Sequence, residues 1–280
     1  MPRLVFMMVF CLALPASAGD RAGEFKTLLK DARASMVDLG GAVSLYVLDT
    51  ETGRSASEND CAARAALGFA GLPLIAVAMK LNARGKFLPT QQVTVTRAHA
   101  VGKKGLAAGR LPVEKPLIDL LVRVLRDGDP TAAAAVVKHI GKRRLAKAGT
   151  QLGLKRTRLD KNTPGGLATS TADIGHALLA ILRMSKKERP EWKPVTRLFK
   201  PLKKRVLASS VPTDVRANEF EGGRATSSAY RVAVLRKGPA WLMVIASYPR
   251  LLDAGATRKA LNNLAGGLGA YMATVPTPKN

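Results

Sequence analysis

Residues 61–80 read CAARAALGFAGLPLIAVAMK, and the rest of the fold is predicted to form around them. Apolar residues recur there at helical spacing and also fill the other faces (Leu72, Leu74, Ile75, Val77 and Met79). A helix that is apolar on every side is a buried helix. Pro73 suits its first turn, where a proline loses no hydrogen bond. Enzymes often place a nucleophile just before such a helix, because its amides and dipole stabilise negative charge, but residues 68–71 (GFAG) contain none.

The N-terminus has the pattern of an export signal. Arg3 precedes an apolar run over residues 4–14, and the small residues at 16–18 form a cleavage site. We expect residues 1–18 to be a signal peptide and residues 19–280 to form one domain, exported to the periplasm or secreted. The alternative, a membrane anchor, is disfavoured because a span needs about 20 apolar residues. The mature chain would keep one cysteine, Cys61, and so could form no internal disulfide. Once the signal is removed, we expect no transmembrane segment.

The chain is strongly basic, with 45 Lys and Arg against 20 Asp and Glu and a formal net charge of +25. The positive electrostatic field of such a chain attracts polyanions. Aromatic residues make up only 5% of the chain, which argues against a base-stacking platform, and no specific nucleic-acid motif appears. A solvated basic surface and a surface that binds an anionic polymer both stay open.

Periodicity and turn residues predict an α+β protein. The expected elements are a helix over 22–38, a hairpin of 42–48 and 54–58, the central helix, a strand over 93–96, a surface loop over 102–109, helices over 114–126, 132–140, 143–152 and 170–184, a linker to about 205, a hairpin of 229–235 and 240–248, and a helix over 253–272. Thr131 is predicted to cap one helix, and Ser170 with Asp173 to form a capping box.

Strands from both ends of the chain can pair into one antiparallel sheet covered by the first and last helices. The α/β lobe would take about 22–62 and 206–275, and an all-helical lobe about 63–205. A cleft between two lobes is a common position for a ligand.

In order and spacing these pieces resemble the class A β-lactamase and penicillin-binding (DD-peptidase-like) superfamily of serine hydrolases. Gly71-Leu72-Pro73 looks like the family's Lys-Leu-Pro after the nucleophile. The segments 46–53, 93–96, 152–160 and 168–173 follow in the family's order, and the resemblance covers nearly the whole mature chain. It implies a two-lobed β-lactamase/transpeptidase-like fold.

The resemblance also implies that the family's three catalytic motifs are degenerate here. Its Ser-x-x-Lys corresponds to Gly68 and Gly71, its Ser-Asp-Asn to Gly128-Asp129-Pro130, and its Lys-Thr-Gly to Asn218-Glu219-Phe220. The loop that carries the family's deacylating glutamate shrinks to residues 161–167, which contain no acid. No serine of the chain is followed three residues later by lysine. We therefore assign no catalytic residue.

No cofactor or metal is predicted, because His99, His139 and His176 lack a metal-ligand spacing. The favoured function is a non-catalytic binding or scaffold protein of the cell envelope, which binds cell-wall peptide or another envelope protein in its cleft. Two alternatives stay open. One is an active enzyme. It would be a serine hydrolase with a displaced nucleophile (Thr131, Ser170, Ser209 or Ser210), or it would use Asp129 and Glu219 as a general acid and base. The other is a polyanion-binding basic envelope protein.

Overall fold

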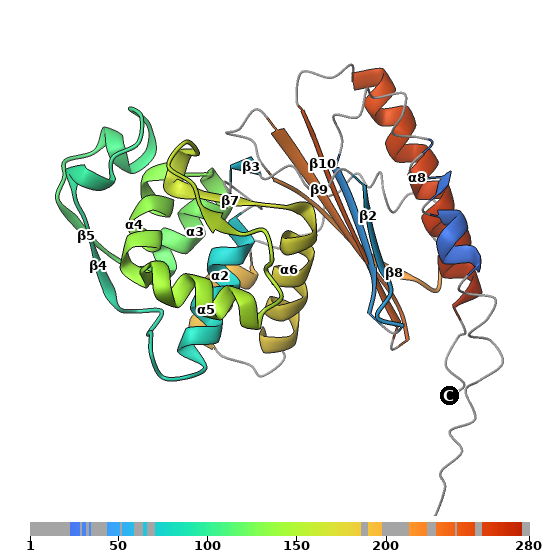
Figure 1. Cartoon of the computed structure of the whole chain (residues 1–280), viewed down its shortest axis with the longest axis horizontal. Coiled ribbons are helices and arrows are strands. Elements are labelled where there is room, and N and C mark those ends of the chain that lie inside the picture. The colour runs from blue at the N-terminus through green and yellow to red at the C-terminus, as the bar shows by residue number, and fades with distance from the viewer. Residues whose placement is uncertain are drawn as a thin grey trace, which may run out of the picture.

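The computed structural model describes residues 23–28, 30–31, 34, 44–50, 52–58, 64–65, 71–185, 190–197, 213–222, 228–238, 240–249 and 254–275. They form a helical lobe and a lobe built on an antiparallel sheet (Figure 1). The predicted signal peptide, Cys61 and Gly68 lie outside the described residues. None of the described helices combines the length and the apolar content that a membrane span requires.

The large sheet joins the two ends of the chain, as predicted. Its antiparallel order is β2 (Ser55–Glu58), β1 (Ser44–Asp49), β10 (Ala240–Pro249), β9 (Ser228–Lys237) and β8 (Arg216–Gly222). In the register of β1 with β10, Tyr46 lies opposite Ile245. Both predicted hairpins, β1–β2 and β9–β10, are confirmed.

Alternate residues of each strand serve different cores. Leu45 and Val47 belong to the core between the sheet and α8 (Ala254–Thr274), which also contains Phe25 of the first helix. Tyr46 and Leu48 belong to the core shared with the helical lobe. In Figure 1, α8 and the first helix cover one side of the sheet, and the helical lobe lies on the other.

The central helix is α2 (Leu72–Asn82), and all of its residues except Lys80 are buried. It contacts α3 (Leu117–Asp127), α4 (Pro130–Ile140), α5 (Lys142–Gln151) and α6 (Thr171–Ser185). This confirms the prediction of a helix buried on all sides. Helix α6 also contacts β1 and β10, and so joins the lobes. The approach needs a glycine, because a Cβ on Gly175 would lie 2.6 Å from Cε1 of Tyr46.

Shorter elements complete the helical lobe. Strand β4 (Gln92–Val95) pairs with β5 (Val113–Pro116), and β7 (Leu167–Thr169) pairs with β3 (Arg64–Ala65) and β6 (Arg158–Leu159). The 3₁₀ turns are η2 (Arg97–His99), η3 (Gly105–Ala108), η4 (Pro164–Gly166) and η5 (Pro190–Trp192), and the last leads into α7 (Lys193–Thr196).

Four local predictions were wrong. The helix expected from residue 114 begins at Leu117, because 113–116 pair with β4. The cap of α4 is Asp129 rather than Thr131. The loop over 102–109 contains η3, and the linker after 185 contains η5 and α7, whose Trp192 and Val195 are buried.

Candidate functional site

The start of α2 is closed by a neighbouring helix. Gly71 is the N-cap of α2, with φ −74° and ψ −9°, and it is buried. A Cβ built on Gly71 would lie 2.5 Å from Cγ1 of Val124 on α3, closer than real Cβ contacts. Val124 is itself fully buried. In a close-packed interior a side chain at position 71 would therefore force the Val124 side chain to move. Gly68, the other predicted position, lies outside the described residues.

The segment Gly128-Asp129-Pro130 links two helices. Gly128 ends α3 in the left-handed conformation, with φ 63°, and Pro130 is the first residue of α4. Between them Asp129 is 4% exposed, and its Oδ1 accepts hydrogen bonds from the amides of Thr131 (2.9 Å) and Ala132 (3.1 Å). These are the bonds of a helix N-cap.

The same carboxylate also holds the η3 turn. Its Oδ2 accepts a hydrogen bond from the amide of Leu106 at 2.9 Å. Gly105 has φ 62°, and a Cβ on it would lie 2.5 Å from this oxygen, so only glycine fits there. Thr131 adds a second link, because its Oγ1 accepts a hydrogen bond from the amide of Val101 (3.0 Å). Asp129 and Thr131 thus anchor the 101–108 loop to α4.

The third predicted motif lies on an edge strand. In the described sheet β8 pairs only with β9, with Asn218 opposite Val234, Glu219 opposite Ala233 and Phe220 opposite Val232. Their side chains lie outside the described part of the chain. A carboxylate pair of Asp129 with Glu219 stays a prediction.

Two of the candidate nucleophiles are buried at helix starts. Ser170 is 2% exposed, and its Oγ accepts a hydrogen bond from the amide of Asp173 at 3.3 Å, which is the predicted cap. Thr131 is fully buried and bonded to Val101. Within the described residues, neither hydroxyl is bonded to a basic side chain that could take its proton. Ser209 and Ser210 lie outside those residues.

The three histidines lie on separate elements. Nδ1 of His99 on η2 accepts a hydrogen bond from the amide of Thr96 (3.0 Å), and the ring of His139 on α4 meets Phe87 edge-on at 5.2 Å. Nε2 of each is buried and has no hydrogen-bond partner among the described residues. His176 on α6 shares a hydrogen bond of 3.3 Å with the Tyr46 hydroxyl.

Burial and nearby cations shift two of these histidines. Burial lowers the pKa of His99, and the charge of Lys138 lowers it further. Burial likewise lowers the pKa of His139, and Arg144 adds to the effect. Both imidazoles are therefore favoured in the neutral form. Across the ranges that the structure describes, no group of three or more His, Cys, Asp or Glu could hold a metal ion.

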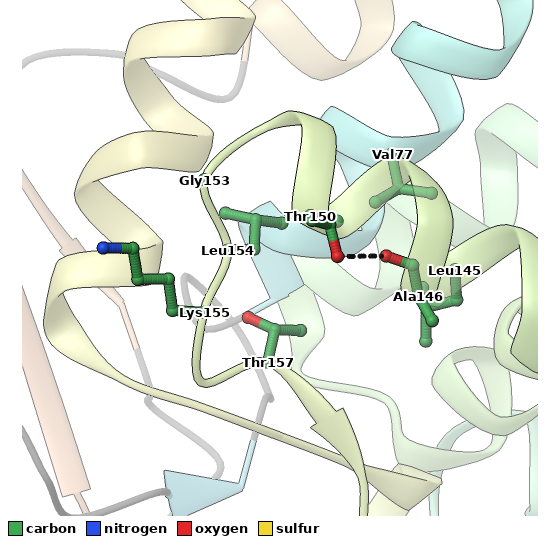
Figure 2. A pocket seen from close by; sticks show the side chains of 9 residues that line it. Val77, Leu145, Ala146, Thr150, Gly153, Leu154, Lys155 and Thr157 are labelled. Carbon is green, nitrogen blue, oxygen red and sulfur yellow. Dashed lines mark hydrogen bonds between the residues drawn. The ribbon is translucent and has the colours of Figure 1, made fainter.

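A pocket of about 280 Å³ lies further along α2, between α5 and the 153–157 segment (Figure 2). Val77 is six residues beyond Gly71, about 9 Å along the helix, so this pocket is separate from the helix start. Val77, Leu145 and Leu154 form its apolar wall, and Lys155, which also lines it, extends its side chain away from the cavity.

Asp173 on α6 fixes the segment beside this pocket. Its carboxylate accepts hydrogen bonds from the amides of Lys155 (3.0 Å), Arg156 (2.8 Å) and Thr157 (2.5 Å), and from the Thr157 hydroxyl (2.6 Å). Of the capping box expected for Ser170 and Asp173, the bond from the Asp173 amide to the Ser170 hydroxyl is present, whereas the Asp173 carboxylate binds residues 155–157. Sequence reasoning missed this contact and the pocket, because no local pattern brings residue 173 to residues 155–157.

Comparisons with known proteins agree with this architecture. A family model described as "Beta-lactamase enzyme family" matches residues 26–263. A β-lactamase from Xanthomonas campestris is similar at 17% identity and a TM-score of 0.62, covering 88% of this chain and 98% of its own. A β-lactamase from Sphaerobacter thermophilus is similar at 17% identity and a TM-score of 0.63, covering 90% of this chain and 99% of its own. A PBP-A mutant solved as an acyl-enzyme complex with penicillin G is similar at 12% identity and a TM-score of 0.67, covering 89% of this chain and 97% of its own.

These likenesses to solved structures show the fold alone, and among curated proteins none matches the sequence significantly. The two-lobed α+β architecture predicted from the sequence is confirmed. The match over residues 26–263 covers most of the 280 residues, and it decides the family. The chain belongs to the beta-lactamase enzyme family.

Proposed function

We propose that this chain is a non-catalytic member of its family, exported to the cell envelope, where it acts as a binding or scaffold protein. Acyl transfer by a serine hydrolase needs a nucleophile and a base within hydrogen-bond reach of each other. Among the similar structures, PBP-A is described as an acyl-enzyme with penicillin G. By the resemblance described above, the positions that correspond to the nucleophile and base of the family are Gly68 and Gly71.

The contact of Gly71 with Val124 carries the proposal. A glycine that replaced lysine by simple truncation would leave space for the missing side chain. At Gly71 that space holds Cγ1 of Val124, 2.5 Å from the position of a Cβ. The base position is therefore filled by packing, and a lysine could not return there without movement of Val124.

The second motif supports the same reading. Both carboxylate oxygens of Asp129 accept hydrogen bonds from backbone amides of α4 and η3. These three hydrogen bonds give Asp129 a structural role in ordering the start of α4 and the η3 turn. Export is supported by the charged, apolar and small-residue pattern of residues 1–18. The ligand we propose for the cleft is cell-wall peptide or another envelope protein.

The test is acylation. The mature chain, residues 19–280, is incubated with a reporter penicillin and its intact mass is read, with an active class A β-lactamase as the positive control. We expect an unchanged mass and no turnover of a chromogenic cephalosporin. A stable adduct would overturn the proposal, and peptide mapping would then locate a displaced nucleophile.

A Gly68→Ser variant sharpens this test. It restores a hydroxyl without a base at position 71, and such a hydroxyl is a weak nucleophile. We expect its mass to stay unchanged on the timescale in which the control enzyme is fully acylated. Rapid acylation of Gly68→Ser would mean that a base is already in place, and would contradict a non-catalytic role.

A further inference from the structure

Residues 138–161, here called the basic segment, contain nine Lys and Arg and one acidic residue, Asp160. The segment runs from the end of α4 through α5 to the residues after β6. All nine cationic side chains are exposed: Lys138, Lys142, Arg143, Arg144, Lys147, Lys155, Arg156, Arg158 and Lys161. The pocket lining places the 153–157 segment against α5 (Figure 2), so the exposed cations of these two neighbouring segments lie on adjoining parts of the surface.

The carboxylates described near this region, Asp160 and the buried Asp173, are too few to balance its nine cations. Asp160 accepts a hydrogen bond from the amide of Asn162 (2.9 Å), and the buried Asp173 is bonded to the backbone of residues 155–157. Within the described residues, no ion pair joins Lys142, Arg143 or Lys147 to an acid. The positive charge of α5 is thus directed to solvent.

Helix stability does not explain these charges either. Lys142, Arg143 and Arg144 occupy the first turn of α5, which contains no acidic residue. Cations at the N-terminal end of a helix are opposed by its dipole. Like charges close together on one helix also repel one another. The placement costs stability, and an anionic partner would offset that cost.

The surroundings restrict the kind of anion. Over the described surface the large exposed hydrophobic residue is Leu88, which is 61% exposed and lies outside the basic segment. Phe87, which contacts α5 through the guanidinium of Arg144, is buried beneath that group at 5.5 Å. The segment itself contains no Phe, Tyr or Trp, and the ring of its one histidine, His139, packs against Phe87. It therefore offers neither an apolar wedge for a bilayer nor a platform on which bases stack.

We propose that the basic segment binds a linear polymer of phosphate groups, through the charge of the phosphates alone. Exposed lysines and arginines spread over α5 and residues 155–161 suit a chain of repeated anions better than a single small anion. Binding by charge releases counterions, so affinity must fall steeply with salt. This interaction goes beyond the proposed function and does not require the chain to be non-catalytic.

The test uses fluorescently labelled inorganic polyphosphate and the mature chain, with anisotropy read between about 50 and 200 mM salt. We expect the logarithm of the affinity to fall linearly with the logarithm of salt concentration, by about 0.7 to 0.9 per phosphate neutralised. A triple variant, Lys142→Gln, Arg143→Gln and Lys147→Gln, should bind roughly tenfold more weakly or worse and lose about 2 to 3 units of that slope.

A matched control removes the same charge elsewhere. Lys26→Gln, Lys30→Gln and Lys259→Gln are exposed positions on the first helix and α8, on the far side of the sheet (Figure 1). The control should bind polyphosphate within about threefold of the parent chain, since only long-range charge is lost. Circular dichroism of both triples checks that the fold is kept.

Several outcomes would overturn the inference. These are no binding of polyphosphate, a salt dependence near zero, or equal losses in the two triple variants. A single-stranded oligonucleotide of matched phosphate count should bind about as well as polyphosphate. A tenfold preference for the oligonucleotide would show that bases are read, and a comparable preference for anionic phospholipid vesicles would point to a membrane surface; either contradicts recognition of a phosphate chain by charge alone.

Discussion

Val124 on α3 fills the space in front of Gly71 on α2, so that a Cβ at position 71 would lie 2.5 Å from Val124 Cγ1. The two residues are 53 positions apart, and their contact joins the start of the central helix to a helix that ends beside Asp129. A double-mutant cycle on this pair measures the coupling free energy between positions 71 and 124.

Gly71→Ala should destabilise the protein by about 1–3 kcal/mol, because overpacking a filled site forces neighbours apart. Val124→Ala should cost about 2 kcal/mol through the cavity it leaves. In the double variant the new methyl group partly occupies that cavity, so the costs should be less than additive, with a coupling of roughly 1–2 kcal/mol. Urea unfolding of all four proteins measures the cycle. Strictly additive free energies would mean that Val124 does not block position 71.

Asp129→Ala should lower the free energy of unfolding by about 2–4 kcal/mol. It removes the cap of α4, worth about 1 kcal/mol, and leaves the buried amide of Leu106 without its acceptor, which costs about 1–3 kcal/mol. The matched control is Asp127→Ala two residues earlier, where the carboxylate is exposed and paired with Arg126. That change should stay within about 0.5 kcal/mol. Equal losses at both positions would refute the anchoring role of Asp129.

Stability should fall as the pH drops below neutrality. Burial lowers the pKa of His99 and of His139 in the folded chain, with Lys138 and Arg144 adding to the respective shifts. The unfolded chain therefore takes up these protons first, near pH 6.5. The contribution of the two histidines is complete above that pH and is lost as the pH falls toward the lowered pKa values of the folded state.

Urea unfolding between about pH 5 and 7.5 measures this dependence. A His99→Gln, His139→Gln double variant removes both titrating groups and should show a flatter dependence over the same range. A parent protein whose unfolding free energy does not change between about pH 5.5 and 7 would contradict the prediction.

Lys237 should be important for docking of the last helix. This lysine is 6% exposed at the end of β9, its Nζ donates to the carbonyls of Met272 and Ala273 at 3.4 Å, and it pairs with Asp214 at 3.1 Å. It thus meets the negative end of the α8 dipole. Lys237→Met keeps the apolar stem and should cost about 1–3 kcal/mol. Lys259→Met, exposed on the same helix, should change stability by less than about 0.5 kcal/mol. A Lys237→Met protein as stable as its parent would show that α8 docks without this cation.

Local patterns were sufficient for most of the architecture. The all-round apolar run of residues 72–79 predicted a buried helix, and alternating strands at both ends of the chain predicted one antiparallel sheet; the structure has both. Local sequence patterns gave the wrong prediction where a contact with another residue or strand decided the structure. Residues 113–116 read as the start of a helix but pair with β4, and Thr131 read as a cap although Asp129 provides the acceptor.

The sequence by itself determined the main helices and the two long hairpins, and it placed glycines at 68 and 71 and the acid at 129. Periodicity and turn chemistry are set by near neighbours, which explains this success. Only the tertiary structure decided what those positions do: that Val124 closes Gly71, that Asp129 holds the amide of Leu106, and that Asp173 reaches residues 155–157. Each of these depends on packing between residues remote in the chain, and a sequence read in order contains no measure of such distances.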